Sequence, residues 1–146
     1  MQSVSDHLTK KQVILLVVLF AAALAGVVCA RGTRGVLSAH YRVDTTAGRQ
    51  AYLHTLGWDI DPMSEDVRET DVPEAFDRVT ARYNALQREQ GFDLMPYAGK
   101  HVSIVTYTLA DEPDTFVVLW ICDGIVIAGD VHTAAMDGWM KGIIQD

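Results

Sequence analysis

The 146-residue chain has few cysteines and few basic residues, and each shortage excludes a class of protein. Its two cysteines are Cys29 and Cys122, and Cys29 lies inside a long apolar run. No disulfide is therefore expected within the folded part, whose stability must come from a hydrophobic core. Residues 31–146 contain 10 Lys and Arg against 18 Asp and Glu, a net charge of −8. A domain of this sign repels phosphate backbones, so we expect no nucleic acid among its partners.

Sequence motifs of several enzyme classes are also missing. No P-loop, G-x-G-x-x-G fingerprint or Cys/His zinc spacing occurs. Ser103 and Cys122 are the candidate nucleophiles, but neither has the G-x-S-x-G surroundings of a nucleophile elbow. Cys122 lies in an apolar run, which is typical of a buried and inert thiol. The sequence therefore predicts no cofactor and assigns no catalytic residue.

The longest apolar run lies near the start of the chain. Residues 13–30 read VILLVVLFAAALAGVVCA, without a charge and with two basic residues close to each end. At about 1.5 Å per residue, a helix of this length covers most of a hydrocarbon core about 30 Å thick. Three interpretations are open: a cleaved signal peptide, a lipoprotein signal and an uncleaved anchor. The run is long for a signal peptide, and no small residue directly precedes Cys29 for lipidation, so a single-pass anchor is favoured.

The orientation of this anchor does not follow from charge, because basic residues flank both ends. A short tail before the run and a folded domain after it are typical of an N-terminal signal anchor. This arrangement places the C-terminal domain outside the cytoplasm. The predicted organisation is a tail at 1–12, a transmembrane anchor in the lipid bilayer of the cell membrane at 13–30, a linker at 31–44 and an α+β domain at 45–146.

The first half of the domain predicts a helix followed by short extended segments. Asp-Thr-Thr at 44–46 offers three N-caps for a helix over 47–56, and Gly57 suits the left-handed turn that ends it. Residues 58–62 alternate apolar and polar side chains and predict a short strand. The acidic stretch 64–71 is expected to be solvated or to form an edge strand.

A second helix is predicted from the capping-box spacing of Asp-Val-Pro-Glu at 71–74, and Gly91 is expected to close it. Glu74 and Arg78 would form an i,i+4 ion pair on its outer face. The apolar residues that recur at helical spacing are Phe76, Val79, Tyr83 and Leu86.

The second half of the domain predicts strands. Residues 101–109 are dense in β-branched and aromatic side chains. Two apolar runs, 115–122 and 125–130, flank Asp-Gly at 123–124, whose residues suit a type I′ hairpin turn. The first of these runs is unbroken, which predicts a central strand. The expected fold is α+β, with two helices packed on one face of a small antiparallel sheet.

Several stretches resemble the DUF4830 family. They are AYLHTLGWDID, EAFDRVTARYNALQREQGFDLMPYAGKHVSIVTYTL and LWICDGIVIAGDVHTAAMDGWMKG, which together cover about residues 50–142. The most specific features are Gly57-Trp58, Tyr83-Asn84, Leu86-Gln87, Gly91-Phe92-Asp93-Leu94, Gly129-Asp130 and Asp137-Gly138. The resemblance implies a bacterial protein, mainly of Firmicutes, whose domain follows a membrane segment. It implies no activity, since the family is uncharacterised.

Two positions depart from the family pattern. A second glycine often occupies the place of Ala128, and a cysteine often takes the place of His132. A catalytic or metal role of His132 would therefore be a property of this chain and not of the family.

The first candidate site consists of Asp130, at the end of the last predicted strand, and of His132 and Asp137, which follow it. Carboxylates and imidazoles can supply oxygen and nitrogen ligands to a divalent ion. Asp123 lies at the other end of that strand, about 20 Å away at roughly 3.3 Å per residue, and cannot join them. In the alternative interpretation, Asp130 and Asp137 accept backbone hydrogen bonds in turns.

Asn84, Gln87, Asp93 and Tyr97 are the second set of candidate binding residues. Asn84 and Gln87 are i,i+3 neighbours, so they face the same way on a helix. Such side chains can bind a ligand, or they can tie the following loop to the helix. Trp58, Trp120 and Trp139 are expected to pack in or around the core.

Two functional hypotheses follow. In the first, the chain is a single-pass membrane protein whose extracytoplasmic domain binds a protein or a small molecule. In the alternative, it is a small anchored metal-dependent hydrolase that uses Asp130, His132 and Asp137.

Overall fold

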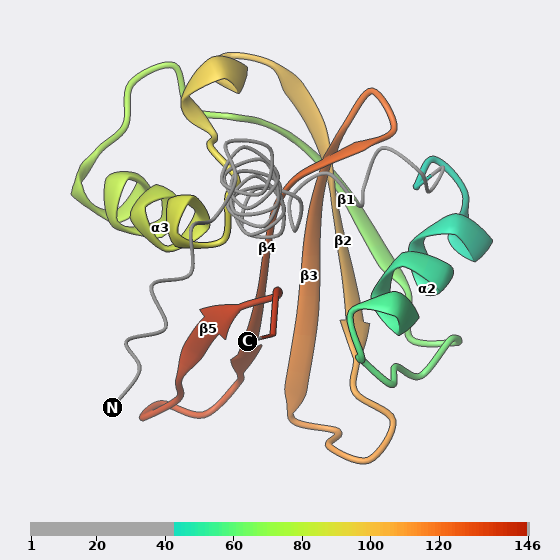
Figure 1. Cartoon of the computed structure of the whole chain (residues 1–146). Coiled ribbons are helices and arrows are strands. Elements are labelled where there is room, and N and C mark those ends of the chain that lie inside the picture. The colour runs from blue at the N-terminus through green and yellow to red at the C-terminus, as the bar shows by residue number, and fades with distance from the viewer. Residues whose placement is uncertain (1–42, 146) are drawn as a thin grey trace, which may run out of the picture. The chain divides into compact units, whose positions relative to one another are not determined.

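The computed structural model of the chain describes residues 43–145. The anchor predicted at 13–30 and most of the linker lie outside these residues. Among the described residues, no helix is both long enough and apolar enough to cross a membrane. In chain order the elements are α2 (Thr46–Thr55), β1 (Asp66–Asp71), α3 (Arg78–Glu89), the 3₁₀ helix η2 (Met95–Tyr97), β2 (His101–Thr108), β3 (Thr115–Cys122), β4 (Ile125–Thr133) and β5 (Met140–Gly142) (Figure 1).

The five strands form one antiparallel sheet in the order β1-β2-β3-β4-β5, so each strand pairs with its neighbour in the sequence. The predicted hairpin is confirmed: Asp123 and Gly124 have φ angles of 52° and 76°, as a type I′ turn requires. Of the two expectations for the acidic stretch, the edge strand is the one that forms, as β1. The sequence did not predict β5, because three residues are too short to carry a pattern.

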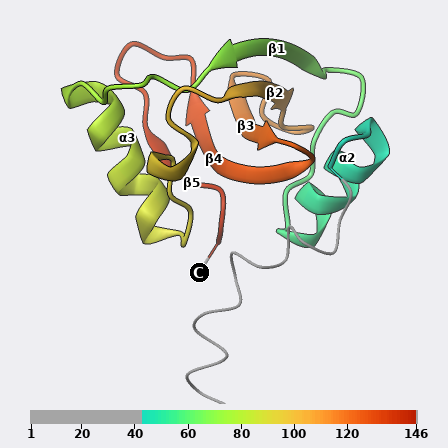
Figure 2. The same cartoon turned by 90° about the horizontal axis from the view of Figure 1, so that it is seen from above.

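The two helices cover opposite faces of the sheet, which corrects the expectation that both lie on one face. Along β3, Val117 and Leu119 belong to a core cluster that includes residues of α2. Trp120 and Cys122 belong to a second cluster, on the side of Tyr83 from α3. Figure 2 shows α2 and α3 on either side of the strands. Because β3 is apolar on both of its faces, each face needs a cover of its own.

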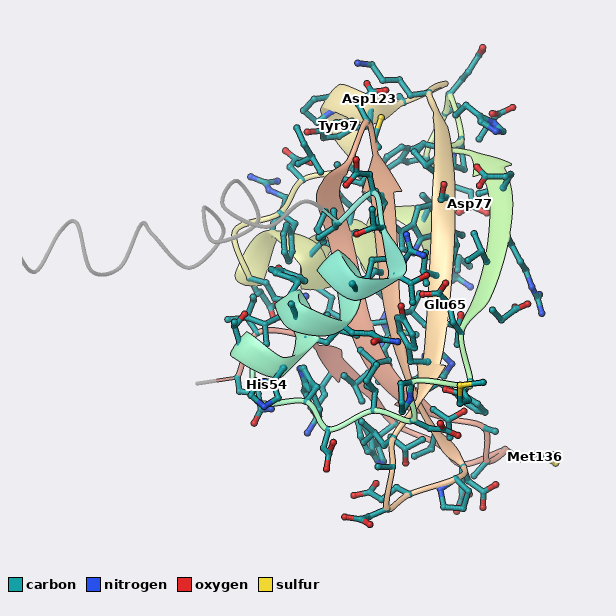
Figure 3. The ribbon with its side chains drawn as sticks, turned by 90° about the vertical axis from the view of Figure 1, so that its right-hand side faces the viewer. His54, Glu65, Asp77, Tyr97, Asp123 and Met136 are labelled. Carbon is teal, nitrogen blue, oxygen red and sulfur yellow. The ribbon has the colours of Figure 1, made fainter. Side chains whose placement is uncertain are left out.

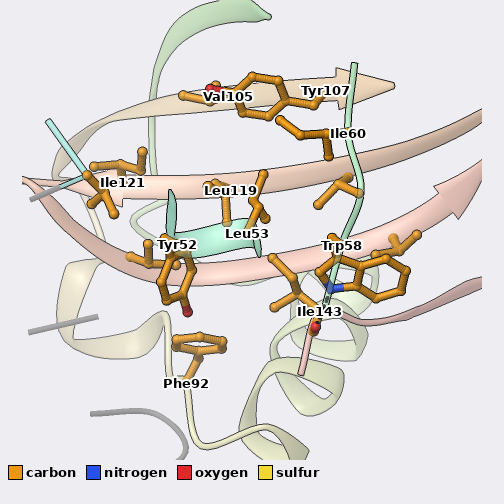
Figure 4. Close-up of a cluster of buried hydrophobic side chains, with 14 residues drawn as sticks. Tyr52, Leu53, Trp58, Ile60, Phe92, Val105, Tyr107, Leu119, Ile121 and Ile143 are labelled. Carbon is orange, nitrogen blue, oxygen red and sulfur yellow. Dashed lines mark hydrogen bonds between the residues drawn. The ribbon is translucent and has the colours of Figure 1, made fainter. Parts of the chain in front are cut away.

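Helix α2 is the element that the sequence predicts best. The hydroxyl of Thr45 accepts a hydrogen bond from Gly48 N at 3.1 Å and caps the helix, which ends before Gly57 with its φ of 83°. Tyr52 and Leu53 are fully buried against the sheet (Figure 4).

The segment 58–62 is extended but does not form a strand. Its one sheet contact is an isolated antiparallel bridge between Ile60 and Leu109. Trp58 and Ile60 are buried while Asp59 and Asp61 are exposed, so the predicted alternation holds. The indole N–H of Trp58 donates to the backbone oxygen of Ile143 at 2.7 Å and ties this segment to the end of the chain.

Helix α3 begins six residues later than predicted, at Arg78, with Asp77 as its N-cap. The carboxylate of Asp77 accepts a hydrogen bond from Thr80 N at 2.7 Å. Asp71, the predicted cap, is the last residue of β1. Backbone bonds from Val72 N to Lys100 O and from Gly99 N to Val72 O continue the strand edge, so the chain cannot coil there.

The face that α3 turns to the sheet also differs from the prediction. Val79 is 71 % exposed, whereas Asn84 and Gln87 are buried. Glu74 precedes the helix, so the predicted i,i+4 ion pair with Arg78 is not a helical pair. The predicted apolar stripe holds in part: Phe76 and Tyr83 pack against the second core cluster, whereas Val79 does not face the sheet.

A polar cluster fastens α2 to the start of β1. The guanidinium of Arg49 donates to both carboxylate oxygens of Glu65, at 2.8 and 3.2 Å. Thr46 and Tyr107 donate hydroxyl hydrogen bonds to the same carboxylate. Burial alone raises the pKa of Glu65, but these hydrogen bonds and the charge of Arg49 outweigh it and hold the pKa below its ordinary value.

This cluster predicts an acid-sensitive contribution to stability. Because the pKa of Glu65 is lower in the folded chain, its stabilising effect is complete above the pKa of the unfolded chain and is lost as the pH falls through the folded value. We expect Glu65→Gln to lower the free energy of unfolding by about 1.5–3 kcal/mol at pH 7, the range for hydrogen bonds to charged groups. Urea denaturation at pH 7, 5 and 3 measures this difference, which should shrink toward pH 3. A difference that stays constant with pH would contradict the assignment.

Candidate functional site

Three side chains from α3 and β4 form a buried polar cluster. Asp130 is 3 % exposed. Its Oδ2 accepts a hydrogen bond from the Tyr83 hydroxyl at 2.7 Å, and its Oδ1 lies 2.7 Å from Nδ1 of His132. Asp130 and His132 are two residues apart in β4 and so share a face of the sheet. The spacing in the strand and the position of α3 therefore build the cluster together.

The cluster orients the imidazole of His132. An ionised carboxylate only accepts hydrogen bonds, so Asp130 holds the hydrogen on Nδ1 and leaves Nε2 as the second ring nitrogen. The ring packs near Phe116, with centroids 5.8 Å apart, and 32 % of the His132 side chain is exposed. The imidazole is therefore held in one orientation while part of its surface stays accessible.

Tyr83 acts as a hydroxyl donor in this cluster. Burial raises its pKa far above the ordinary value, and the neighbouring charge of Asp130 raises it further. Its ring lies 5.8 Å from that of Trp120. Sequence reasoning placed Tyr83 on an apolar stripe and missed this role. The available signal was that a buried tyrosine hydroxyl needs a polar partner.

Asp137 does not complete a three-residue site with Asp130 and His132. It is exposed in the loop between β4 and β5. Across residues 43–145, no group of three or more His, Cys, Asp and Glu side chains is arranged to hold a metal ion. The structure thus joins two of the three predicted residues.

Asn84 and Asp93 tie the loop after α3 to the helix, as one of the two interpretations predicted. Asn84 Oδ1 accepts from Leu94 N at 2.8 Å, and its Nδ2 donates to Asp93 Oδ1 at 2.9 Å. Asp93 Oδ1 also accepts a hydrogen bond from Met95 N at 3.0 Å. The Asn84 bond is the largest cause that lowers the pKa of Asp93. Tyr97 lies apart from this tie, with the ammonium of Lys100 5.6 Å from its ring centroid.

Gln87 is fully buried and bonds the edge of β4 instead of a loop. Its Oε1 accepts from Gly129 N at 2.9 Å, while Nε2 of Gln90 donates to Gly129 O at 3.1 Å. Oε1 of Gln90 accepts from Ile144 N at 3.0 Å. These two side-chain amides pair with backbone groups beyond the last residue of β5, Gly142, where no strand covers the edge of β4. The sequence analysis did not single out Gln90.

Two further candidates of the sequence analysis are accounted for by local contacts. The hydroxyl of Ser103 donates to Glu69 Oε1 at 2.8 Å, and no histidine among residues 43–145 forms a hydrogen bond with it. Cys122 is 4 % exposed, and burial raises the pKa of its thiol. Both observations fit structural roles.

The fold and the cluster define a small α+β domain with a Tyr83–Asp130–His132 cluster between α3 and β4. The sequence model described as "Domain of unknown function (DUF4830)" matches residues 52–130, more than half of the chain, and the chain belongs to this family. The match includes Tyr83 and Asp130 and stops before His132. No curated protein and no solved structure matches the chain.

The cluster predicts a specific cost for losing the Tyr83 hydroxyl. Tyr83→Phe leaves one oxygen of a buried carboxylate without its donor, so we expect the free energy of unfolding to fall by about 1–3 kcal/mol. Tyr97→Phe is the matched control, because that residue is half-buried and its hydroxyl makes no hydrogen bond among residues 43–145. Urea denaturation at pH 7 compares the two variants. Equal stabilities would show that the Tyr83–Asp130 bond does not support the fold.

Proposed function

We propose that this chain is a single-pass membrane protein, anchored through residues 13–30, whose α+β domain is an extracytoplasmic binding or protein-interaction module. The apolar run and the flanking basic residues support the anchor. The α+β domain that follows the anchor comprises the described residues 43–145.

The observation that carries the binding function is an exposed apolar loop on an otherwise acidic domain. Met136, Trp139 and Met140 are 108 %, 45 % and 51 % exposed. Exposed apolar patches of this kind mark interaction sites in soluble domains. By contrast, both carboxylate oxygens of Asp130 already have hydrogen-bond partners, Tyr83 and His132. The carboxylate therefore orients the imidazole of His132 and is not open to a ligand.

The alternative function, an anchored metal-dependent hydrolase, retains one supporting observation. A carboxylate that orients an imidazole is a recurring arrangement of general bases, and Asp130 orients His132 in this way. Among residues 43–145, no third His, Cys, Asp or Glu side chain joins the pair to hold a metal ion, and Asp137 does not join it. Turnover of a substrate that is lost in His132→Gln would favour this alternative over the binding module.

The proposed location has a direct test in intact cells stripped of their wall. Protease added outside should digest the domain at 43–145 without lysis, because the anchor leaves it on the outer side. Digestion after detergent lysis is the control, because it shows that the protease can cleave the domain once the membrane is no barrier. Protection until lysis would place the domain in the cytoplasm and reject the extracytoplasmic assignment.

A further inference from the structure

The loop between β4 and β5 gathers exposed apolar side chains at one end of the domain. Residues 134–140 read AAMDGWM, and all seven are exposed. Three of the exposed large hydrophobic residues of the described chain belong to this stretch: Met136, Trp139 and Met140. Asp137 is its one charged residue. Figure 3 shows Met136 at the end of the domain opposite Asp123.

The loop is built to hold these side chains outward. Thr133 N donates to Trp139 O at 3.2 Å, and Gly138 N donates to Ala135 O at 2.9 Å. A Cβ on Gly138 would lie 2.6 Å from Thr133 Oγ1, so the close turn requires glycine. The outward position of the apolar residues is therefore fixed by backbone contacts and by a residue that cannot be exchanged.

The ammonium of Lys141 forms a cation–π contact with the ring of Trp139. The ammonium lies 5.0 Å from the ring centroid of Trp139 and 5.1 Å from that of Trp58. Within residues 43–145, Lys141 forms no ion pair with a carboxylate. A tryptophan with neighbouring methionines and a lysine is suited to the boundary between acyl chains and headgroups, since indole and lysine each have an apolar body and a polar end.

We propose that the loop at 134–140 inserts its apolar side chains into the surface of a lipid bilayer. This inference names the bilayer as the partner of the loop that carries the proposed binding function. It rests on the proposed anchor, because three side chains bind a membrane weakly unless the chain is already held there. The domain is acidic, so the expected surface is a zwitterionic one.

The length of the linker permits this contact. The described chain starts beside the β3–β4 hairpin, where a Cβ on Gly124 would lie 3.7 Å from Asp44 Cβ. The nine residues of β4 separate this hairpin from the loop, a distance of roughly 30 Å. Residues 31–42 can extend to at most roughly 40 Å. An anchor ending at residue 30 therefore leaves enough chain for the loop to reach the same bilayer.

The test uses the full chain in phosphatidylcholine vesicles that contain lipids brominated in the upper part of the acyl chain. Bromine quenches nearby indoles, so we expect quenching of the chain's tryptophan fluorescence that is mostly lost in Trp139→Phe. The double variant Met136→Ser/Met140→Ser should reduce quenching of Trp139 at least twofold. Met63→Ser/Met95→Ser is the matched control, because both of these methionines are exposed outside the loop, and it should leave quenching unchanged.

The outcomes separate this inference from the proposed anchor. A chain that alkaline carbonate washes off the vesicles has no anchor, and the proposed function fails. A chain that resists the wash but shows no difference in quenching between the parent and Trp139→Phe overturns the membrane contact alone. The loop would then be a surface for a protein partner.

Discussion

The pairing of α3 with the edge of β4 is the constraint on which the rest of the domain depends. Gln87 and Gln90 bond both the N–H and the C=O of Gly129, at the point where β5 is too short to do so. This contact sets the height of α3 over the sheet and brings Tyr83 onto Asp130. It also requires glycine at 129, where a Cβ would lie 2.9 Å from Ile143 Cγ2. Ile143 therefore packs over an edge of β4 whose backbone N–H and C=O already have hydrogen-bond partners in Gln87 and Gln90.

The same constraint explains why α3 buries the side-chain amide of Gln87. A strand edge presents polar backbone groups, and these must be paired when they are covered. Gln87 satisfies two donors through one oxygen, although its own Nε2 has no partner among the described residues, a cost of about 1–3 kcal/mol. The helix is therefore held by specific hydrogen bonds as much as by apolar contact.

The sequence predicted the elements whose signals are local and missed those set by contacts across the fold. The cap of α2, the Asp-Gly turn and the central strand follow from neighbouring residues, and each was confirmed. The start of α3 was wrong because the capping-box spacing at 71–74 is overruled by backbone bonds between Val72 and the chain near Lys100. Asp130 and His132 were singled out by residue type, but the predicted strand ended at 130, and it is the longer β4 that places both on one face. The hydrogen bond between Tyr83 and Asp130 spans 47 residues and leaves no local pattern in the sequence.

The central claim is that side-chain amides of α3 take the place of a strand at the edge of β4. Residue-resolved hydrogen exchange by NMR tests this claim most directly at the N–H of Gly129. If Gln87 accepts this hydrogen bond, the amide should exchange as slowly as the core amides of β3, and Gln87→Ala should make it exchange much faster. Fast exchange of Gly129 in the parent chain, at the rate of the exposed loop at 134–139, would contradict the account.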